Sequence, residues 1–196
     1  ATGRGAQVGS FGPDGAFYVQ LRDEGGVFRL TPHSRELIIP TGEGTDLDVV
    51  LQVVALPDGS LLIYDWNKQC LHRYNAGGNR RKTIIPPDTY QALVGLTVYN
   101  NILYYLGNYR LFRQNLDAEF APERLPQPPA GDFVGYAVDR QGIVCAIAKE
   151  KKWPGKRSDR FPIGLCSLTL SGEARFIAYV ELFRYTPLFL LLQEDK

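Results

Sequence analysis

The sequence predicts an all-β protein that is assembled from four repeats of short antiparallel strands. Three observations support this fold class. A turn followed by an apolar run recurs along the chain at a regular spacing. The 196 residues are rich in strand-forming aromatics (10 Phe, 11 Tyr, 2 Trp) and in turn-forming residues (20 Gly, 13 Pro). No stretch keeps the apolar period of an amphipathic helix, so helices are expected to be nearly absent.

The recurring turn is marked by Gly15, Gly59, Asn101 and Gly142, which are separated by 44, 42 and 41 residues. The first two markers close a Pro-Asp-Gly motif, and the third closes Asn-Asn. Asp-Gly and Asn-Asn favour the positive φ values of tight hairpin turns. Each marker therefore predicts the link between the first two strands of a repeat.

Two further signatures follow each of the first three turns in the same order. One is an arginine inside an apolar run, at Arg29, Arg73 and Arg113. The other is an Ile-Pro or Leu-Pro ending, which suits an outer strand because proline cannot donate to a central ladder. The repeated arginines predict a structural role, either an ion pair between repeats or a stem packed over a neighbouring strand, rather than a ligand-binding ring.

The second repeat illustrates the four strands, which we place at residues 51–56, 60–64, 69–75 and 81–85. Four short antiparallel strands in about forty residues are typical of one blade of a β-propeller. We therefore predict a β-propeller, or a segment of one, as a single domain over residues 1–196. The predicted blades cover approximately residues 6–48, 49–91, 92–132 and 133–185, and an extra C-terminal strand covers 186–193.

Four complete blades and one further strand leave three ways to finish the structure. The interpretation that we favour is a longer propeller, whose remaining blades are missing from this chain or lie on another. The alternatives are a compact four-bladed closure sealed by the last strand, and addition of that strand to an exposed edge of a partner. Exposed strand edges would also allow the chain to associate with itself.

The Pro-Asp-Gly turns at 13–15 and 57–59, together with the repeat length, resemble the NHL-type and related six-bladed (TolB-like) propellers. The resemblance covers nearly the whole chain and concerns the repeat. It implies the fold, and it also implies an alternative function, because related propellers hold a cation in the central channel. That alternative is a metal-dependent, lactonase-like hydrolase or lyase. No motif of this sequence assigns a channel ligand to a numbered residue.

Acidic residues in the connections between blades are the candidate metal ligands. We select Glu43, Asp48, Asp88 and Asp132, which are expected at the same mouth of the propeller. Several carboxylates that converge there would suit a hard cation such as Ca²⁺, which is the one cofactor that the sequence suggests. The other interpretation is that these residues are solvated and cap turns.

A long basic connection interrupts the fourth repeat and is the candidate binding loop. Residues 149–160 carry six Lys or Arg in twelve positions. Lys151, Lys152, Trp153 and Arg157 are selected from it, because loops presented by a rigid scaffold often carry function. The other interpretation is a solvated insertion.

The cysteines and histidines do not form a recognisable catalytic motif. Cys70 and His72 lie on one face of a predicted strand and could both bind zinc, but no second pair completes a site. Cys145 and Cys166 fall on neighbouring strands, either as free thiols or as a disulfide. Neither His72 nor His33 is expected to be catalytic.

The charge balance limits the possible partners. A net charge of +1 gives no broad electrostatic basis for binding nucleic acid. The longest apolar run, residues 187–192, is too short to insert across a bilayer. The compartment stays open, with an extracytoplasmic location favoured. We therefore predict a non-catalytic binding or scaffold module whose loop face holds a protein, a peptide or a small ligand.

Overall fold

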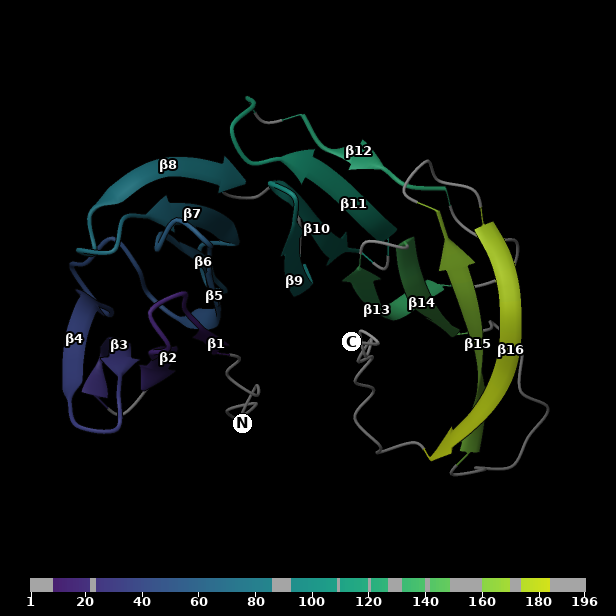
Figure 1. The fold of residues 1–196 in the computed structure, drawn as a ribbon, viewed down its shortest axis with the longest axis horizontal. Coiled ribbons are helices and arrows are strands. Elements are labelled where there is room, and N and C mark those ends of the chain that lie inside the picture. The colour runs from purple at the N-terminus through teal and green to yellow at the C-terminus, as the bar shows by residue number, and fades with distance from the viewer. Residues whose placement is uncertain are drawn as a thin grey trace. The chain divides into compact units, whose positions relative to one another are not determined.

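The fold is all-β and of the propeller type, as the repeats predicted. The computed structural model describes residues 9–21, 24–85, 93–108, 110–119, 121–126, 132–139, 142–148, 160–169 and 174–183. Within these residues lie sixteen strands and no α-helix. The strands form four antiparallel sheets of four strands each (Figure 1).

The chain divides into two compact units, Ala1–Leu93 and Val94–Lys196. The first unit holds two sheets, each of which follows the order of the sequence. The strands of the first sheet are β1 (Ser10–Phe11), β2 (Phe17–Leu21), β3 (Gly26–Leu30) and β4 (Arg35–Pro40). Those of the second sheet are β5 (Val50–Ala55), β6 (Leu61–Asp65), β7 (Cys70–Tyr74) and β8 (Arg80–Ile85).

The second unit holds the third and fourth sheets. The strands of the third sheet are β9 (Leu93–Tyr99), which begins at the boundary, β10 (Ile102–Gly107), β11 (Arg110–Asn115) and β12 (Glu123–Arg124). Those of the fourth sheet are β13 (Asp132–Asp139), β14 (Gly142–Ala148), β15 (Arg160–Leu168) and β16 (Ala174–Phe183). The predicted extra strand at 186–193 lies outside the described residues, and the single-domain interpretation stays a prediction.

The turns between the first two strands of the first three repeats have the predicted backbone, and residues 140–141 of the fourth turn lie outside the described residues. Gly15 and Gly59 have φ values of 75° and 78°, and Asn100 and Asn101 have 49° and 61°. In the first two turns the aspartate of Pro-Asp-Gly also accepts a hydrogen bond from the backbone two residues later. All four predicted strands of the second repeat are present within one residue of their expected starts.

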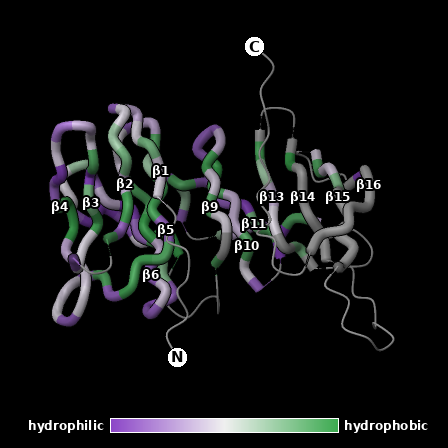
Figure 2. The backbone as a smooth tube through the Cα atoms, turned by 90° about the horizontal axis from the view of Figure 1, so that it is seen from below, coloured by the Kyte–Doolittle hydropathy of each residue, from purple (hydrophilic) through white to green (hydrophobic). Residues whose placement is uncertain are grey.

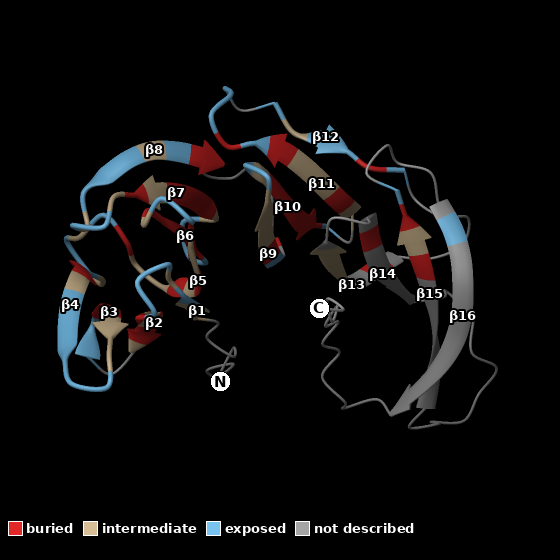
Figure 3. Ribbon diagram, in the orientation of Figure 1, coloured by how far each residue is buried: buried red, intermediate tan, exposed pale blue. Residues whose placement is uncertain are grey.

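The first and second sheets pack on one another through a shared apolar core. Tyr18, Val27 and Ile39 of the first sheet meet Leu61 and Ile63 of the second. The buried colour in Figure 3 is concentrated on β6 and β7, whereas β4 and much of β8 are exposed. Figure 2 shows hydrophobic residues along β5 and hydrophilic ones in the connecting turns of this unit.

The third and fourth sheets pack by the same scheme. Tyr104, Leu106 and Leu111 of the third sheet form a buried cluster with Ile143 and Leu168 of the fourth. The Tyr136 hydroxyl, on β13, donates to the carbonyl oxygens of Tyr104 and Gly95.

The repeated arginines form ion pairs within their own sheets. Arg29 contacts Asp14 at 2.8 Å, and Arg73 contacts Asp58 at 2.7 Å, so each bridges β3 or β7 to the Pro-Asp-Gly turn of the same sheet. The prediction of ion pairs between repeats is therefore wrong for these arginines. Arg29 is also the main reason why the pKa of Asp14 lies below its ordinary value.

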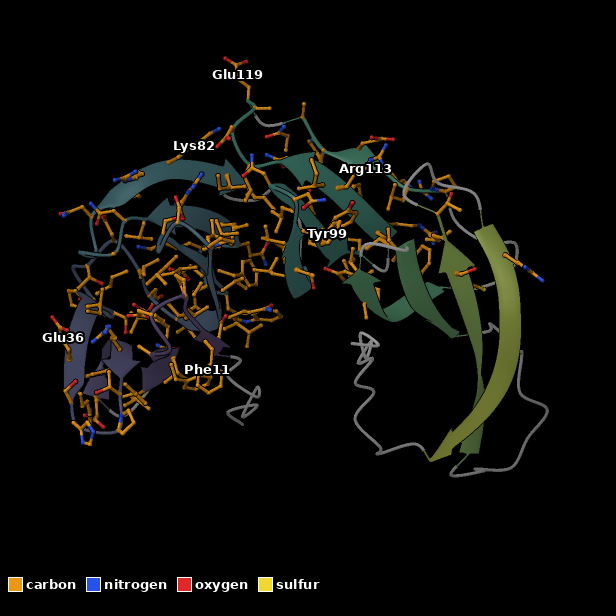
Figure 4. All side chains as sticks on the ribbon, viewed as in Figure 1. Phe11, Glu36, Lys82, Tyr99, Arg113 and Glu119 are labelled. Carbon is orange, nitrogen blue, oxygen red and sulfur yellow. The ribbon has the colours of Figure 1, made fainter. Side chains whose placement is uncertain are left out.

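The third repeat uses a different partner for its arginine. Its turn carries Asn100 where the first two repeats have aspartate, and an amide offers no negative charge. Arg113 instead forms a bidentate pair with Glu123 on β12, at 2.7 and 3.0 Å (Figure 4). The arginine position is kept while the acidic partner moves to another strand.

Candidate functional site

Two loops meet at one end of the second sheet and form the best-defined candidate site in the described part of the chain. We call residues 41–49 and 65–68 the Asp65 loop cluster. Asp65 ends β6 and is fully buried. Its Oδ2 accepts a hydrogen bond from the backbone N–H of Asp48 at 2.6 Å, and its Oδ1 accepts one from the N–H of Lys68 at 3.1 Å. One carboxylate thereby ties both loops together.

Further contacts fix the loop 41–49 on this anchor. The Lys68 ammonium donates to the carbonyl oxygens of Thr45 and Asp46 at 3.2 and 2.8 Å. The Asn67 side-chain amide donates to Asp48 Oδ2 at 2.8 Å. Leu47 is fully buried and holds the middle of the loop in the core. The loop is therefore a constrained surface, although it has no regular secondary structure.

Trp66 gives this surface an apolar side chain. It is 42% exposed, although its backbone N–H donates to the Val49 carbonyl oxygen at 2.7 Å. Its ring meets the Tyr64 ring edge-on, with centroids 6.4 Å apart. Tyr64 is itself fixed, because it is fully buried and its hydroxyl accepts from the N–H of Leu93. An aromatic ring held in this way can stack on a ligand with little loss of conformational entropy.

The predicted carboxylates are only partly placed by the structure. Glu43 is exposed in the loop, and Asp48 is half-buried with one oxygen engaged by Asn67. Asp88 lies outside the described residues, and for Asp132 only the backbone at the start of β13 is described. Within the described set, no group of three or more His, Cys, Asp or Glu could hold a metal ion. The four-carboxylate Ca²⁺ site stays a prediction.

The residues selected from the predicted basic loop are Lys151, Lys152, Trp153 and Arg157, and all four lie outside the described residues. The loop therefore stays a prediction. A search for membrane spans over the described part of the chain finds no helix that is long and apolar enough to cross a bilayer.

Cys70 and His72 do meet, as their shared strand face predicts. Cys70 Sγ lies 3.0 Å from His72 Nε2, and His72 Nδ1 lies 3.1 Å from Thr83 Oγ1. Burial raises the pKa of the Cys70 thiol to about 11 and lowers that of the His72 imidazole. A buried thiol that keeps its proton is a poor nucleophile, so the pair has a structural character. His33 lies exposed in the turn between β3 and β4.

Asp65 is the residue whose role sequence reasoning missed. Like Asp139, it is the last residue of a strand, and the residues next to it in the sequence do not by themselves predict its burial. The available signal was its place at the end of an apolar run, just before a tight turn.

The two packed pairs of four-stranded sheets define the class of protein as a β-propeller-type fold. No protein-family model and no curated protein matches the sequence. Solved propeller structures do match. A protein assigned as a gluconolactonase is 19% identical with a TM-score of 0.58, over 85% of this chain and 60% of that one. Virginiamycin B lyase from Staphylococcus aureus is 14% identical with a TM-score of 0.55, over 93% and 71%.

Binding proteins match equally well. The structure of YCF48 bound to D1 peptide is 10% identical with a TM-score of 0.57, over 88% of this chain and 53% of that one. The chain thus spans less than two thirds of the length of the gluconolactonase and of YCF48, at 60% and 53%. At these identities the likeness establishes the fold, and the matched proteins include both enzymes and binding scaffolds.

Proposed function

We propose that this chain is a non-catalytic binding module whose Asp65 loop cluster holds a peptide segment of a partner protein. The observation that carries the proposal is the exposed Trp66 ring on two loops that a buried carboxylate locks together. A rigid aromatic side chain beside polar groups is the usual anchor of a protein interface.

The surroundings of Trp66 favour a peptide as the ligand. Asp48 and Asn67 place a carboxylate and an amide on the same loop cluster, and these groups can bind a basic side chain or a backbone amide. The peptide complex of YCF48 supports the proposal, since a propeller of similar fold binds a peptide. We also propose that the repeats are of the NHL type, which their Pro-Asp-Gly turns and their length resemble.

The test is selection from a displayed library of random peptides with the intact chain. We expect enriched peptides to carry an apolar or aromatic residue and to lose at least about tenfold in affinity for Trp66→Ala. The matched control is Phe11→Ala, which removes another exposed aromatic ring, 72% exposed, from a different surface. Equal binding by wild type and Trp66→Ala would contradict the proposal.

The alternative function is a metal-dependent, lactonase-like hydrolase or lyase. It rests on the four predicted carboxylates and on the fold that the chain shares with a gluconolactonase. Hydrolysis of simple sugar lactones would be measured with added Ca²⁺ and after EDTA. Turnover that requires Ca²⁺ and is lost in Asp48→Asn would favour the enzyme over the binding module.

A further inference from the structure

Three polar side chains share the face of β7 that packs on the first sheet. Cys70, His72 and Tyr74 are alternate residues of this strand, and alternate residues of a strand lie on the same face. All three are at most 5% exposed, in line with the buried colour of β7 in Figure 3. Tyr74 also belongs to the apolar core between the first and second sheets. We call these three residues the β7 cluster, and it lies within the first compact unit.

The side chains of Cys70 and His72 face one another. Cys70 Sγ lies 3.0 Å from His72 Nε2, and Thr83 Oγ1 lies 3.1 Å from His72 Nδ1. A thiol is a donor and its sulfur a weak acceptor, so the tautomer that fits both contacts carries its proton on Nδ1. The Nε2 lone pair then faces the sulfur. Metal-binding histidines have the same arrangement, with the second ring nitrogen held by an outer hydrogen bond.

The separation of the sulfur and the nitrogen suits a shared metal ion. In a tetrahedral zinc site the metal lies about 2.3 Å from a thiolate sulfur and about 2.0 Å from an imidazole nitrogen, so the two ligand atoms are about 3.5 Å apart. The observed 3.0 Å differs from this separation by only about 0.5 Å. Small rotations of the two side chains are enough to admit the ion.

Tyr74 supplies a third polar atom on the same face. Its hydroxyl is buried and has no hydrogen-bond partner among the described residues. Its ring meets the His72 ring edge-on, with centroids 6.3 Å apart. Buried hydroxyls are normally hydrogen-bonded, and one without a partner indicates a bound ion or ligand. The Cys and His pair that the sequence left incomplete thus has a tyrosine beside it.

The charge around the β7 cluster favours a cation. Asp65 is fully buried and is the register partner of Cys70 on β6. Its two oxygens accept backbone N–H groups, and no lysine or arginine in the described part of the chain forms an ion pair with it. Buried charges are usually paired or coordinate metals. Burial and the Asp65 charge raise the pKa of the Cys70 thiol to about 11, and a bound cation would reverse this effect because it stabilises the thiolate.

We infer that Cys70, His72 and Tyr74 hold a divalent metal ion of the zinc class in the contact between the first and second sheets. Thiolate and imidazole ligands select such an ion over Ca²⁺, which prefers oxygen ligands. Binding forms a metal–sulfur and a metal–nitrogen bond and releases the thiol proton to solvent. The tyrosine hydroxyl binds through an oxygen lone pair and keeps its proton. Thr83 is exposed, so solvent reaches the residue that contacts His72.

The inferred site differs from both proposals made above. It lies between two sheets, whereas the peptide would bind at the exposed Trp66. It also uses none of the four carboxylates that were predicted to bind Ca²⁺. The role of the ion is structural, because it joins three residues of a buried strand and leaves no ligand at the surface. The inference therefore does not depend on the proposed function.

The experiment is a titration of the reduced, metal-free chain with Co²⁺, a spectroscopic substitute for Zn²⁺ whose bond to a thiolate gives an absorption band in the near ultraviolet. The Cys145→Ser and Cys166→Ser double variant leaves Cys70 as the only thiol of the chain. A band in this background can come from Cys70 alone. We expect one ion per chain with a micromolar or tighter dissociation constant. Zn²⁺ should displace it and Ca²⁺ should not.

Further changes in the same background test each contact. Cys70→Ser should remove the band, and His72→Gln and Tyr74→Phe should each weaken binding at least about tenfold. Thr83→Val, at an exposed position, removes only the outer hydrogen bond to His72 and should also weaken binding about tenfold or more. It is the deciding variant if the buried substitutions misfold. The matched control is His33→Gln, which removes the chain's other histidine from an exposed turn and should bind as the background does.

Three results would overturn the inference. They are the absence of a thiolate–cobalt band when Cys70 is the only thiol, a band that His72→Gln leaves unchanged, and equal weakening by His33→Gln and His72→Gln. Binding that Tyr74→Phe leaves unchanged would remove the tyrosine from the ligand set and so overturn the three-ligand site. Peptide binding at Trp66 is measured separately, so failure of one proposal is distinguishable from failure of the other.

Discussion

The first and second sheets have the same turns and the same ion pair, but they carry different residues on their equivalent faces. Both place an aspartate in the turn and pair it with an arginine two strands away, Asp14 with Arg29 and Asp58 with Arg73. On the equivalent face, however, the first sheet has Leu21 where the second has Asp65. The repeat thus specifies turns and ladders, whereas the face residues reflect what packs against each sheet.

The polar groups on the covered face of the second sheet show how such residues are accommodated. Asp65 accepts two backbone N–H groups, and His72 contacts both Cys70 and Thr83. A buried polar group is costly unless it is hydrogen-bonded, so these partners allow polar residues inside a packed contact. The first sheet has apolar residues at the corresponding positions.

The largest expected effect tests the contact between the two sheets. Gly78, in the turn between β7 and β8, has φ near 80°, and a Cβ there would overlap the carbonyl oxygen of Ile38 on β4. Gly78→Ala should lower the free energy of unfolding by roughly 3 kcal/mol or more, from backbone strain and this clash. Urea denaturation would measure it.

Gly59→Ala is the matched control for that variant. Gly59 has nearly the same φ, 78°, but nothing lies within 4 Å of the position that a Cβ would take. Only backbone strain remains, so a loss of about 1 kcal/mol is expected. Equal losses for the two glycines would show that the sheets do not approach closely at Ile38.

A smaller loss is expected when the anchor of the loop cluster is removed. Asp65→Ala leaves the N–H groups of Asp48 and Lys68 without their acceptor, which should cost about 2–3 kcal/mol. Asp65→Asn retains one acceptor oxygen and should lose less. Hydrogen exchange at residues 45–49 would show whether the loop detaches, and protection equal to wild type in Asp65→Ala would refute the anchoring role.

The ion pair between the repeated arginine and the turn aspartate should contribute less to the free energy of unfolding than the Asp65 anchor does. Arg73 bonds Asp58 and the Ser60 hydroxyl from a side chain that is 17% exposed. Arg73→Ala should cost about 1 kcal/mol, since partly exposed pairs are weak and the arginine stem also packs. The loss in melting temperature of Arg73→Ala would be compared with that of Arg113→Ala, whose partner lies on β12. A larger loss for Arg73→Ala would show that the turn aspartate stabilises the fold more than the β12 glutamate does.

The smallest effect concerns pH. Burial holds the pKa of His72 below its ordinary 6.5, so the folded state favours the neutral ring. Its contribution to stability should be complete above pH 6.5 and decline as the pH falls from there toward the folded pKa. His72→Gln should flatten this part of a pH–stability profile. An unchanged slope would place the titration elsewhere.

Much of the fold was predictable because its signals are local. The Pro-Asp-Gly turns and the alternating strands recur in sequence, and the second repeat was placed almost residue by residue. The ion-pair partners of the arginines were not predicted correctly, because the aspartate lies in a turn fifteen residues away and pairing depends on the folded register.

The candidate site was harder to predict because burial decides it. Asp65 and Asp48 are both aspartates near turns, yet one is a buried anchor and the other lies half-exposed at the surface. Their difference comes from the loop that closes over β6, a contact between residues 17 positions apart. Neither the composition nor the spacing of the residues predicts that contact.

The up-and-down strand order of every sheet has a consequence for how the chain folds. Each ladder joins strands that are neighbours in sequence, so only short loops must close before the first contacts form. Contact order is therefore low for an all-β protein, and folding should be fast for this class. During synthesis the first pair of sheets can assemble before the later repeats emerge from the ribosome, which limits the time that unpaired strands spend exposed.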